Sequence, residues 1–321
     1  MSSNSPLVTL ADVRAAHARI RACVHRTPVL TCGRLDEATG ARLFFKCENF
    51  QKVGAFKARG AHNLILGLGD TEAARGVVTH SSGNHAAAVA LAARRRGVPA
   101  TIVMPRNAPR VKQAAVAGYG ATIVPCEPTL AAREAAAAEI IARTGATLVH
   151  PYDDDRIIAG QGTAALELLE DAPDLELLLT PVGGGGLLSG SAVTAKALRP
   201  GLRVIGTEPA AADDAAQSFR AGRRLAGPPP QTIADGLRVS LGERNFAHII
   251  RHVDDIVTVS EAGIVLAMRL VWESMKIIIE PSSAVPVAAL LENRLPAGGR
   301  RVGVILTGGN VDLDALPWSG R

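Results

Sequence analysis

Short runs of β-branched residues alternate with alanine-rich stretches between residues 77 and 149 of this 321-residue chain, and this alternation restricts the folds that it can adopt. The pattern predicts strands at 77–80, 100–103, 121–124 and 147–149, with helices at 86–96, 109–117 and 130–143 between them. Such strand and helix repeats are typical of a parallel sheet that is covered by helices on both faces. The segment therefore predicts one α/β lobe.

A second series of the same kind follows and predicts another α/β lobe. It consists of a helix at 160–170, a strand at 175–180, a helix at 187–198, a strand at 203–207, helices at 263–275 and 281–290, and a strand at 301–307. The proline-rich stretch 219–231 is expected to be a surface loop. We predict a large domain made of residues 1–76 and 153–321, and a small mobile domain made of residues 77–152.

Composition and charge exclude several classes of protein. The net charge is +5, aromatic residues make up only 3%, and basic runs such as Arg94-Arg95-Arg96 fall at a predicted helix end, where cations oppose the helix dipole favourably. No nucleic-acid surface is therefore predicted. No apolar run approaches the length of a membrane span, and the first residues lack the order of a signal peptide. We expect a cytoplasmic protein that binds no membrane.

Lys57 lies between Phe56 and Ala58, after a predicted strand at 41–47 and at the start of a predicted helix. Ligand sites of α/β proteins form at such strand ends. An isolated lysine is most often a solvated surface charge. A lysine that forms a Schiff base, however, needs a partly desolvated amine, and the ring of Phe56 helps to provide one.

A run of four glycines, Gly183 to Gly186, follows the apolar run 177–182 and precedes a predicted helix. In this arrangement the bare backbone N–H groups and the helix dipole can hold a phosphate. The run lacks the Lys-Ser/Thr pair of a nucleotide P-loop and the spacing of a dinucleotide fingerprint. A phosphate-bearing cofactor is thus favoured over kinase or hydride-transfer chemistry.

The polar loop Ser81-Ser82-Gly83-Asn84-His85 comes directly after the predicted strand 77–80. A single serine or asparagine would be enough to cap the next helix. The polarity of the whole loop therefore indicates a ligand: its N–H groups suit a substrate carboxylate, Asn84 a cofactor oxygen, and Ser82 a proton transfer. A reactive lysine, a phosphate loop and this polar loop are together what a pyridoxal phosphate site requires.

In their order along the chain, these three segments resemble the fold type II pyridoxal phosphate enzymes, in particular the serine racemase and serine/threonine dehydratase branch. The resemblance extends from Arg26-Thr27-Pro28-Val29-Leu30 to Leu306-Thr307-Gly308-Gly309-Asn310. It implies a two-lobed α/β fold like that of the tryptophan synthase β subunit, in which each lobe is an open, mostly parallel sheet flanked by helices. It also implies that the large domain binds pyridoxal 5'-phosphate and that the protein is a homodimer.

The resemblance also implies roles for individual residues around the cofactor. Lys57 would be the catalytic Schiff-base lysine, Phe56 would pack on the ring, and Asn84 would hydrogen-bond the phenolic oxygen. The remaining cofactor-binding residues would be Gly183, Gly184, Gly185, Gly186 and Leu187 at the phosphate, Gly236 near the ring, and Thr307 at the pyridine nitrogen. A neutral hydroxyl at Thr307 should leave that nitrogen unprotonated, which suits β-elimination.

Further residues match a metal site and a substrate site. Glu208, the carbonyl of Ala212, and Asp214 resemble the divalent-cation site of serine racemases, with oxygen ligands suited to Mg²⁺, Ca²⁺ or Mn²⁺; a helix with acidic first-turn residues is the alternative. Implied substrate contacts are Ser81, Ser82, Asn84, His85, Arg133 and Tyr152. Arg133 would reach the substrate carboxylate when the small lobe closes, and Tyr152 would line the side-chain pocket. Either Val239 or Ser240 matches a substrate-contacting serine of the family.

The predicted activity is that of a serine/threonine dehydratase, an ammonia-lyase that converts L-serine or L-threonine to a 2-oxo acid and ammonia. Serine racemase activity is an alternative, because simple threonine dehydratases usually have alanine at the position of Ser82. Dehydration of threo-3-hydroxyaspartate is another, because its extra carboxylate can meet Arg133. A catalytically silent binding or scaffold protein is disfavoured by the intact lysine and phosphate loop. Since the chain ends at Arg321, we do not expect the regulatory domain of biosynthetic threonine dehydratases.

Overall fold

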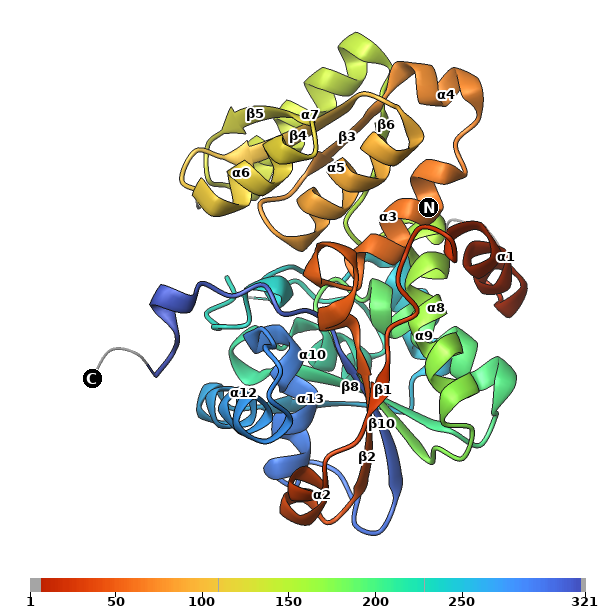
Figure 1. The fold of residues 1–321 in the computed structure, drawn as a ribbon, viewed down its shortest axis with the longest axis vertical. Helices are drawn as coiled ribbons and strands as arrows, with labels where there is room; N and C mark the ends of the chain where they lie inside the picture. Colours follow the sequence, from red (N-terminus) through yellow and green to blue (C-terminus); the bar gives the residue numbers. More distant parts are fainter. Residues whose placement is uncertain (1–6, 109, 228, 319–321) are drawn as a thin grey trace.

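The computed structural model describes residues 7–108, 110–227 and 229–318, which form two lobes with separate β-sheets (Figure 1). The strands are β1 (Val29–Leu30), β2 (Arg42–Cys47), β3 (Val77–His80), β4 (Ala100–Pro105), β5 (Thr122–Cys126), β6 (Thr147–Leu148), β7 (Leu177–Pro181), β8 (Arg203–Pro209), β9 (Asp255–Val259) and β10 (Arg301–Leu306). The α-helices are α1 (Leu10–Ile20), α2 (Gly33–Thr39), α3 (Lys57–Leu66), α4 (Asp70–Arg75), α5 (Asn84–Arg96), α6 (Arg110–Gly118), α7 (Leu130–Thr144), α8 (Asp155–Asp171), α9 (Gly186–Leu198), α10 (Asp214–Ala221), α11 (Glu243–His252), α12 (Glu261–Met275) and α13 (Pro281–Leu291). Short 3-10 helices are η1 (Glu48–Phe50), η2 (Lys52–Gly54), η3 (Ala210–Ala212), η4 (Asp235–Leu237) and η5 (Leu313–Ala315).

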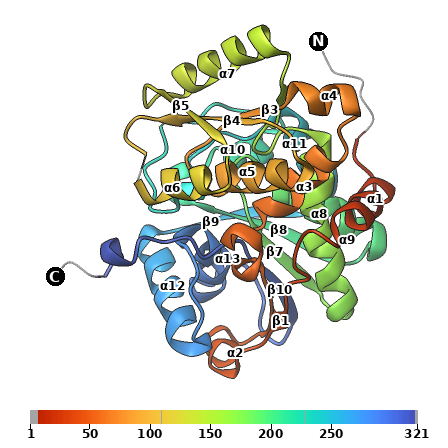
Figure 2. The same ribbon diagram turned by 45° about the horizontal axis from the view of Figure 1, so that its top comes forward.

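The sheet of the large lobe has the strand order β1-β2-β10-β7-β8-β9, and all neighbours are parallel except β1 and β2. Its two faces carry separate cores. Leu177 and Leu179 belong to a cluster with α12 and α13, whereas Leu178 belongs to a cluster with α8 and α9. Figure 2 shows these two helix pairs on opposite sides of the sheet. Successive side chains of a strand point to opposite faces, so a doubly covered sheet needs the unbroken apolar run seen in β7.

The small lobe has a four-stranded parallel sheet in the order β5-β4-β3-β6. Every residue of β3 is buried. Val77 packs in a cluster with α5, and its neighbour Val78 packs in a cluster with α7. Helix α5 ends at Gly97, whose φ of +73° supplies the left-handed C-cap, and its last turn carries three arginines.

Helix α3 connects the two lobes. Its first turn is held in the large lobe by buried charges: Arg59 donates to both Glu48 and Glu167, at 2.7 to 2.8 Å, and Lys46 donates to Glu167 at 2.7 Å. Its far end packs in the apolar cluster of the small lobe through residues such as Leu64. The predicted domain limits, 1–76 with 153–321 and 77–152, and the mobility of the small domain stay predictions. If the lobes do move relative to each other, α3 lies where the hinge would be.

The structure confirms both α/β series, with shifts at some boundaries. Helix α8 begins at Asp155 rather than at residue 160, because the side chain of Asp154 caps it by accepting from Arg156 N–H. Helix α5 begins at Asn84, two residues earlier than predicted. The predicted loop 219–231 is helical at its start, since α10 extends to Ala221.

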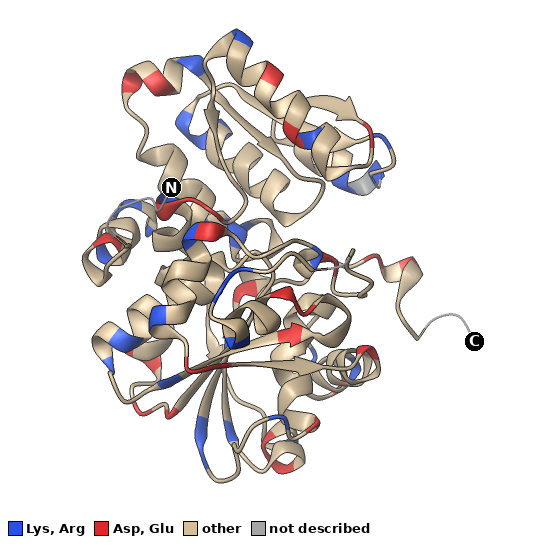
Figure 3. Ribbon diagram, turned by 180° about the vertical axis from the view of Figure 1, so that it is seen from behind, with Lys and Arg blue, Asp and Glu red and all other residues tan. Residues whose placement is uncertain are grey.

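Charged residues are mixed over both lobes in the view of Figure 3, where Lys and Arg alternate with Asp and Glu and form no single basic stripe. Within residues 7–108, 110–227 and 229–318, every helix is too short or too polar to cross a bilayer.

Candidate active site

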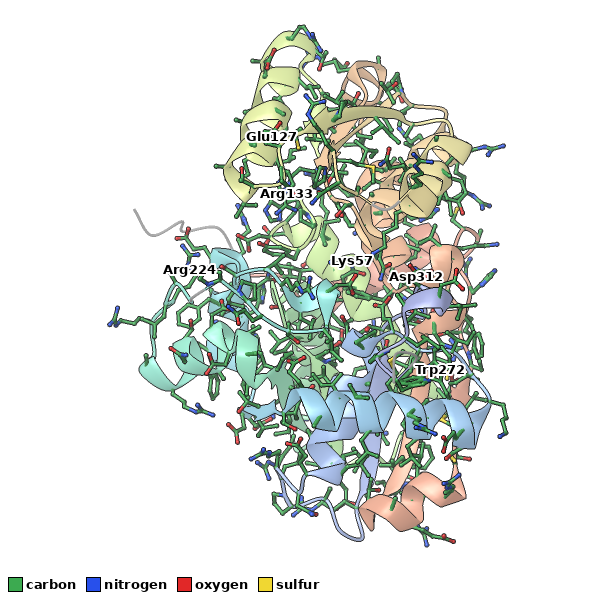
Figure 4. The ribbon with its side chains drawn as sticks, turned by 90° about the vertical axis from the view of Figure 1, so that its left-hand side faces the viewer. Lys57, Glu127, Arg133, Arg224, Trp272 and Asp312 are labelled. Carbon is green, nitrogen blue, oxygen red and sulfur yellow. The ribbon has the colours of Figure 1, made fainter. Side chains whose placement is uncertain are left out.

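Lys57 is the first residue of α3 and is half-buried where the two lobes meet (Figure 4). Its Nζ donates to the carbonyl oxygen of Pro151 at 2.7 Å and lies 5.0 Å from the centroid of the Phe56 ring. Desolvation lowers the pKa of Lys57 to about 8, while the charge of Glu280 acts in the opposite direction. The neutral fraction of the amine near neutral pH is therefore larger than that of an ordinary lysine, which favours its use as a nucleophile.

The tetraglycine lies between β7 and α9, as predicted, and it presents free donors. Among the described residues, no acceptor receives the backbone N–H groups of Gly183 through Leu187. These groups open a 13-residue helix, so the positive end of the helix dipole adds to their attraction for an anion. The loop has the chemistry of a phosphate cradle.

Close packing explains why these positions are glycine. A Cβ on Gly184 would lie 2.2 Å from Cγ of Tyr152, and one on Gly185, whose φ is +94°, would lie 2.8 Å from Cβ of Asn245. Asn245 fixes the loop by donating to the carbonyl oxygens of Gly184 and Tyr152, at 2.8 and 3.1 Å. The Tyr152 ring thus lies directly on the glycine loop, which places this predicted pocket residue beside the cradle.

The polar loop lies at the carboxyl end of β3, and its last two residues form the first turn of α5. The side chain of Asn84 is held by two residues, Glu280 and Asn310. Its Nδ2 lies 3.0 Å from both carboxylate oxygens of Glu280, and its Oδ1 accepts from Nδ2 of Asn310 at 2.9 Å. Oγ of Ser81 accepts from Gly83 N–H at 3.3 Å, whereas no described residue hydrogen-bonds the hydroxyl of Ser82.

Glu280 is a buried carboxylate that the sequence did not indicate as a site residue. Burial raises its pKa to about 7, Asp235 adds to the rise, and the hydrogen bond from Asn84 and the charge of Lys112 oppose it. Glu280 directly precedes Pro281 and occupies the N-cap position of α13, although its side chain makes no capping hydrogen bond. An acidic residue between the apolar run 277–279 and a proline is the sequence signal that could have indicated it.

Thr307 and Gly236 are placed by hydrogen bonds with two serines of α13. The Thr307 hydroxyl is buried and lies 3.0 Å from Oγ of Ser283, and its carbonyl accepts from Phe56 N–H at 2.9 Å. Gly236 N–H donates to Oγ of Ser282 at 3.1 Å. The predicted partner of the pyridine nitrogen is therefore joined through the backbone to the residue before Lys57.

Two histidines near Lys57, His85 and His150, add no positive charge to this region. Nε2 of His85 donates to the carbonyl of Val149 at 2.9 Å, and its Nδ1 is buried with no partner among the described residues. Burial lowers the pKa of His85 to about 3 and that of His150 to about 4. Both rings are neutral at physiological pH, and His85 retains a free acceptor nitrogen.

Arg133 is half-buried in the first turns of α7, and its Nε donates to the carbonyl of Thr129. Figure 4 shows it on the small lobe, across the junction of the lobes from Lys57. The structure therefore does not bring Arg133 into contact with the other predicted site residues, although closure of the lobes would reduce the separation.

A cavity of about 640 Å³ adjoins this site. It is lined by residues of both lobes that include Asn84, Lys112, Tyr119, Asp235, Arg238 and Asn310. Lys112 and Asp235 form an ion pair of 3.1 Å between the lobes. Lys57 does not line this cavity, so the cavity is a neighbour of the lysine site and not the site itself.

The predicted metal ligands lie at the end of β8 and the start of α10. Glu208 accepts from the N–H groups of Ala215 and Ala216, and Asp214 accepts from Leu241 N–H. Burial raises the pKa of both carboxyls, and repulsion between them adds to the rise at Glu208. A divalent cation would relieve this repulsion. Within the described part of the chain, however, no three His, Cys, Asp or Glu side chains gather around one point. The fit to a metal rests on two carboxylates and the carbonyl of Ala212.

Comparisons with known proteins agree with this arrangement. The family model "Pyridoxal-phosphate dependent enzyme" matches residues 20–308. The chain is 52% identical to a beta-hydroxyaspartate dehydratase of Paracoccus denitrificans over 97% of this chain and 99% of that protein, and 48% identical to a serine racemase of Arabidopsis thaliana over 95% and 94%. The crystal structure of a serine racemase from Dictyostelium discoideum superposes with a TM-score of 0.92 at 48% identity, covering 95% of this chain and 99% of that one.

Proposed function

The chain belongs to the pyridoxal-phosphate dependent enzyme family, and on this basis we propose that it is a dehydratase of β-hydroxy amino acids. L-Serine or L-threonine would lose water and then ammonia to give a 2-oxo acid. The observation that carries the proposal is the desolvated amine of Lys57, whose hydrogen-bond partner Pro151 directly precedes Tyr152, the residue that packs on the glycine loop. The names of the relatives give two activities, dehydration and racemisation. Both reactions begin with removal of the proton from the Cα of an amino acid.

The residues present fit the cofactor. The N–H groups of Gly183 to Leu187 would hold the phosphate, Asn84 the phenolic oxygen and Thr307 the pyridine nitrogen. Pyridoxal phosphate, when bound there, supplies an electron sink for the bond broken at Cα. With the uncharged hydroxyl of Thr307 at the pyridine nitrogen, the cofactor would be a weaker electron sink. This suits a substrate whose leaving group departs from Cβ.

Proton transfer falls to this chain's own side chains. The amine of Lys57 would take the proton from Cα, since its lowered pKa of about 8 keeps a neutral fraction available. The Cβ–O bond would then break, and the hydroxyl would leave as water with the proton that Lys57 took from Cα. Addition of water to the released enamine's imine form gives the 2-oxo acid and ammonia. The N–H groups of the loop 81–85 would hold the substrate carboxylate.

Two other activities are candidates at the same site. Dehydration of 3-hydroxyaspartate is favoured by Arg133, a cation on the lobe that would close over the substrate, and by the activity of the Paracoccus relative. Racemisation is favoured by the free hydroxyl of Ser82, which would serve the face of Cα opposite Lys57. In that case Ser82→Ala should reduce racemisation by roughly a hundredfold or more and spare most of the elimination from L-substrates.

We also propose that Glu208, Ala212 and Asp214 hold a Mg²⁺ ion and that the protein is a homodimer. The dimer is supported by large apolar side chains that stay exposed in a single chain, among them Leu266 on α12 and Leu313 on η5, at 58% and 59% exposure. Sedimentation of the protein at micromolar concentration would test it, and a monomer would contradict it.

The central test is release of 2-oxo acid from L-serine, L-threonine and each 3-hydroxyaspartate diastereomer, together with chiral analysis of the remaining substrate. Lys57→Ala should abolish both turnover and the visible absorbance of the bound cofactor. The control is Lys52→Ala, which removes a neighbouring amine on η2 and should change neither. Loss of the cofactor's covalent attachment in the Lys52 variant, or turnover that survives in the Lys57 variant, would overturn the assignment.

A further inference from the structure

The amide of Asn84 is fixed between two residues of the large lobe, although Asn84 itself belongs to the small lobe. Glu280 receives its Nδ2 group, with 3.0 Å to each carboxylate oxygen, and Asn310 donates to its Oδ1 at 2.9 Å. The same Nδ2 atom of Asn310 also donates to the carbonyl of Val53 at 2.8 Å. A donor thus lies on one side of the Asn84 amide and a carboxylate on the other.

Glu280 is itself confined. Its backbone N–H donates to the carbonyl of Gly308 at 2.9 Å, and its Oε2 also accepts from the backbone N–H of Asn310 at 3.3 Å. A Cβ on Gly308 would lie 2.8 Å from Oε1, so only glycine leaves room for the carboxylate. The side chain is 3% exposed. If its oxygens turned away from Asn84, the hydrogen bond that Oε2 accepts from the backbone N–H of Asn310 would be lost.

This geometry selects one of the two orientations of the Asn84 amide. In its ionised form Glu280 only accepts hydrogen bonds, so the NH₂ group of Asn84 faces it, and the donor on Asn310 requires Oδ1 on its side. The NH₂ group has two hydrogens. With one given to Glu280, the other remains for an acceptor in the candidate site.

We propose that Glu280 is a positioning residue that, together with Asn310, presents the second N–H of Asn84 to the phenolic oxygen of the cofactor. In the flipped orientation the carbonyl of Asn84 would face that oxygen, and two acceptors would repel each other. Glu280 acts through Asn84, and its contribution to cofactor binding requires the Asn84 side chain. This inference rests on the proposed cofactor site.

The test is a double-mutant cycle on the affinity for pyridoxal phosphate. Full-length holoenzyme is dialysed against decreasing cofactor concentrations, and the visible absorbance is recorded for the wild type, Glu280→Gln, Asn84→Ala and the double variant. Glu280→Gln should raise the dissociation constant roughly tenfold, the scale of one charge-assisted hydrogen bond, and should shift the absorbance band. On the Asn84→Ala background it should change neither quantity.

Glu292→Gln is the matched control, because Glu292 caps the other end of α13 and accepts from Ser260. It should leave the affinity and the spectrum unchanged. The melting temperature of the cofactor-free protein reports folding damage, and if Glu280→Gln does not fold, Asn310→Ala replaces it in the cycle with the same expected dependence on Asn84.

Two results would overturn the inference while leaving the proposed function intact. One is a Glu280→Gln enzyme with wild-type affinity and spectrum, and the other is an equal loss with and without the Asn84 side chain. Failure of the proposed function looks different, since the wild-type protein would then bind no cofactor and show no visible band.

Discussion

Replacing Arg59 with methionine should destabilise the protein far more than replacing an exposed arginine. Arg59 is completely buried, and its guanidinium contacts Glu48, Glu167 and Thr163. Although burial acts to raise it, the pKa of Glu167 is held below its usual range by hydrogen bonds and charge from Arg59 and by Lys46. Methionine fills much of the same volume but carries no charge, so both buried carboxylates would lose their arginine, while Lys46 would stay paired with Glu167.

The expected loss in the free energy of unfolding is about 3 to 5 kcal/mol, the range for breaking a buried ion pair by removing one partner. The control is Arg26→Met. Arg26 pairs with Glu170 at 2.7 Å, but both side chains are 48% exposed, and such a surface pair contributes about 0 to 1 kcal/mol. The difference between the two variants comes from burial, because both lose an arginine that contacts two carboxylates.

The assay is urea unfolding of both variants, followed by circular dichroism at one fixed cofactor concentration. A third variant combines Arg59→Met with Glu167→Gln, which removes the unpaired negative charge and should recover part of the loss. Equal losses for Arg59→Met and Arg26→Met would refute the reasoning, and so would a double variant less stable than Arg59→Met alone. Because Arg59 lies in the first turn of α3, we also expect weaker cofactor retention in the single variant.

Three further predictions concern the glycine loop, the metal and pH. Gly184→Ala should weaken cofactor binding and cost about 1 to 3 kcal/mol of stability, because its Cβ would lie 2.2 Å from the Tyr152 ring. Adding Tyr152→Ala to this variant should restore part of the cofactor affinity and part of the stability. If the losses of the two single variants simply add in the double variant, the explanation is wrong. Chelation of divalent cations should lower the melting temperature, and Mg²⁺ should restore it. In the Asp214→Ala variant the chelator should leave the melting temperature unchanged. If the chelator does not change the melting temperature of the wild-type protein either, the metal site is excluded. Burial raises the pKa of Glu280 from 4.5 to about 7, so the folded cofactor-free protein binds an extra proton in this window and should lose about 3 kcal/mol of stability as pH rises through it. Glu280→Gln should flatten this dependence in pH-resolved melting curves, and an unchanged slope would show that another group causes it.

Local patterns were sufficient for the elements whose signal repeats along the chain. The apolar run of β7 and the alanine-rich sequence of α5 each indicate a buried element from the residues of that element alone. The sequence was therefore sufficient to predict the α/β organisation of both lobes. Boundaries were less accurate where one side chain sets them, as when Asp154 starts α8 five residues before the predicted position. The cap depends on a single hydrogen bond that no periodicity encodes.

For the candidate site, the sequence by itself determined the chemical groups: the lysine after a strand, the glycine run before a helix and the polar loop at a strand end. Each is a contiguous segment, so its chemistry can be read locally. Only the tertiary structure decided which residues from distant parts of the chain contact these segments, because local spacing does not encode long-range contacts. Glu280 faces Asn84 across 196 positions of the chain, and Glu167 neutralises Arg59 across 108. Those pairings exist because two sheets and their helices pack into two lobes, which brings buried carboxylates to donors that the sequence keeps far apart.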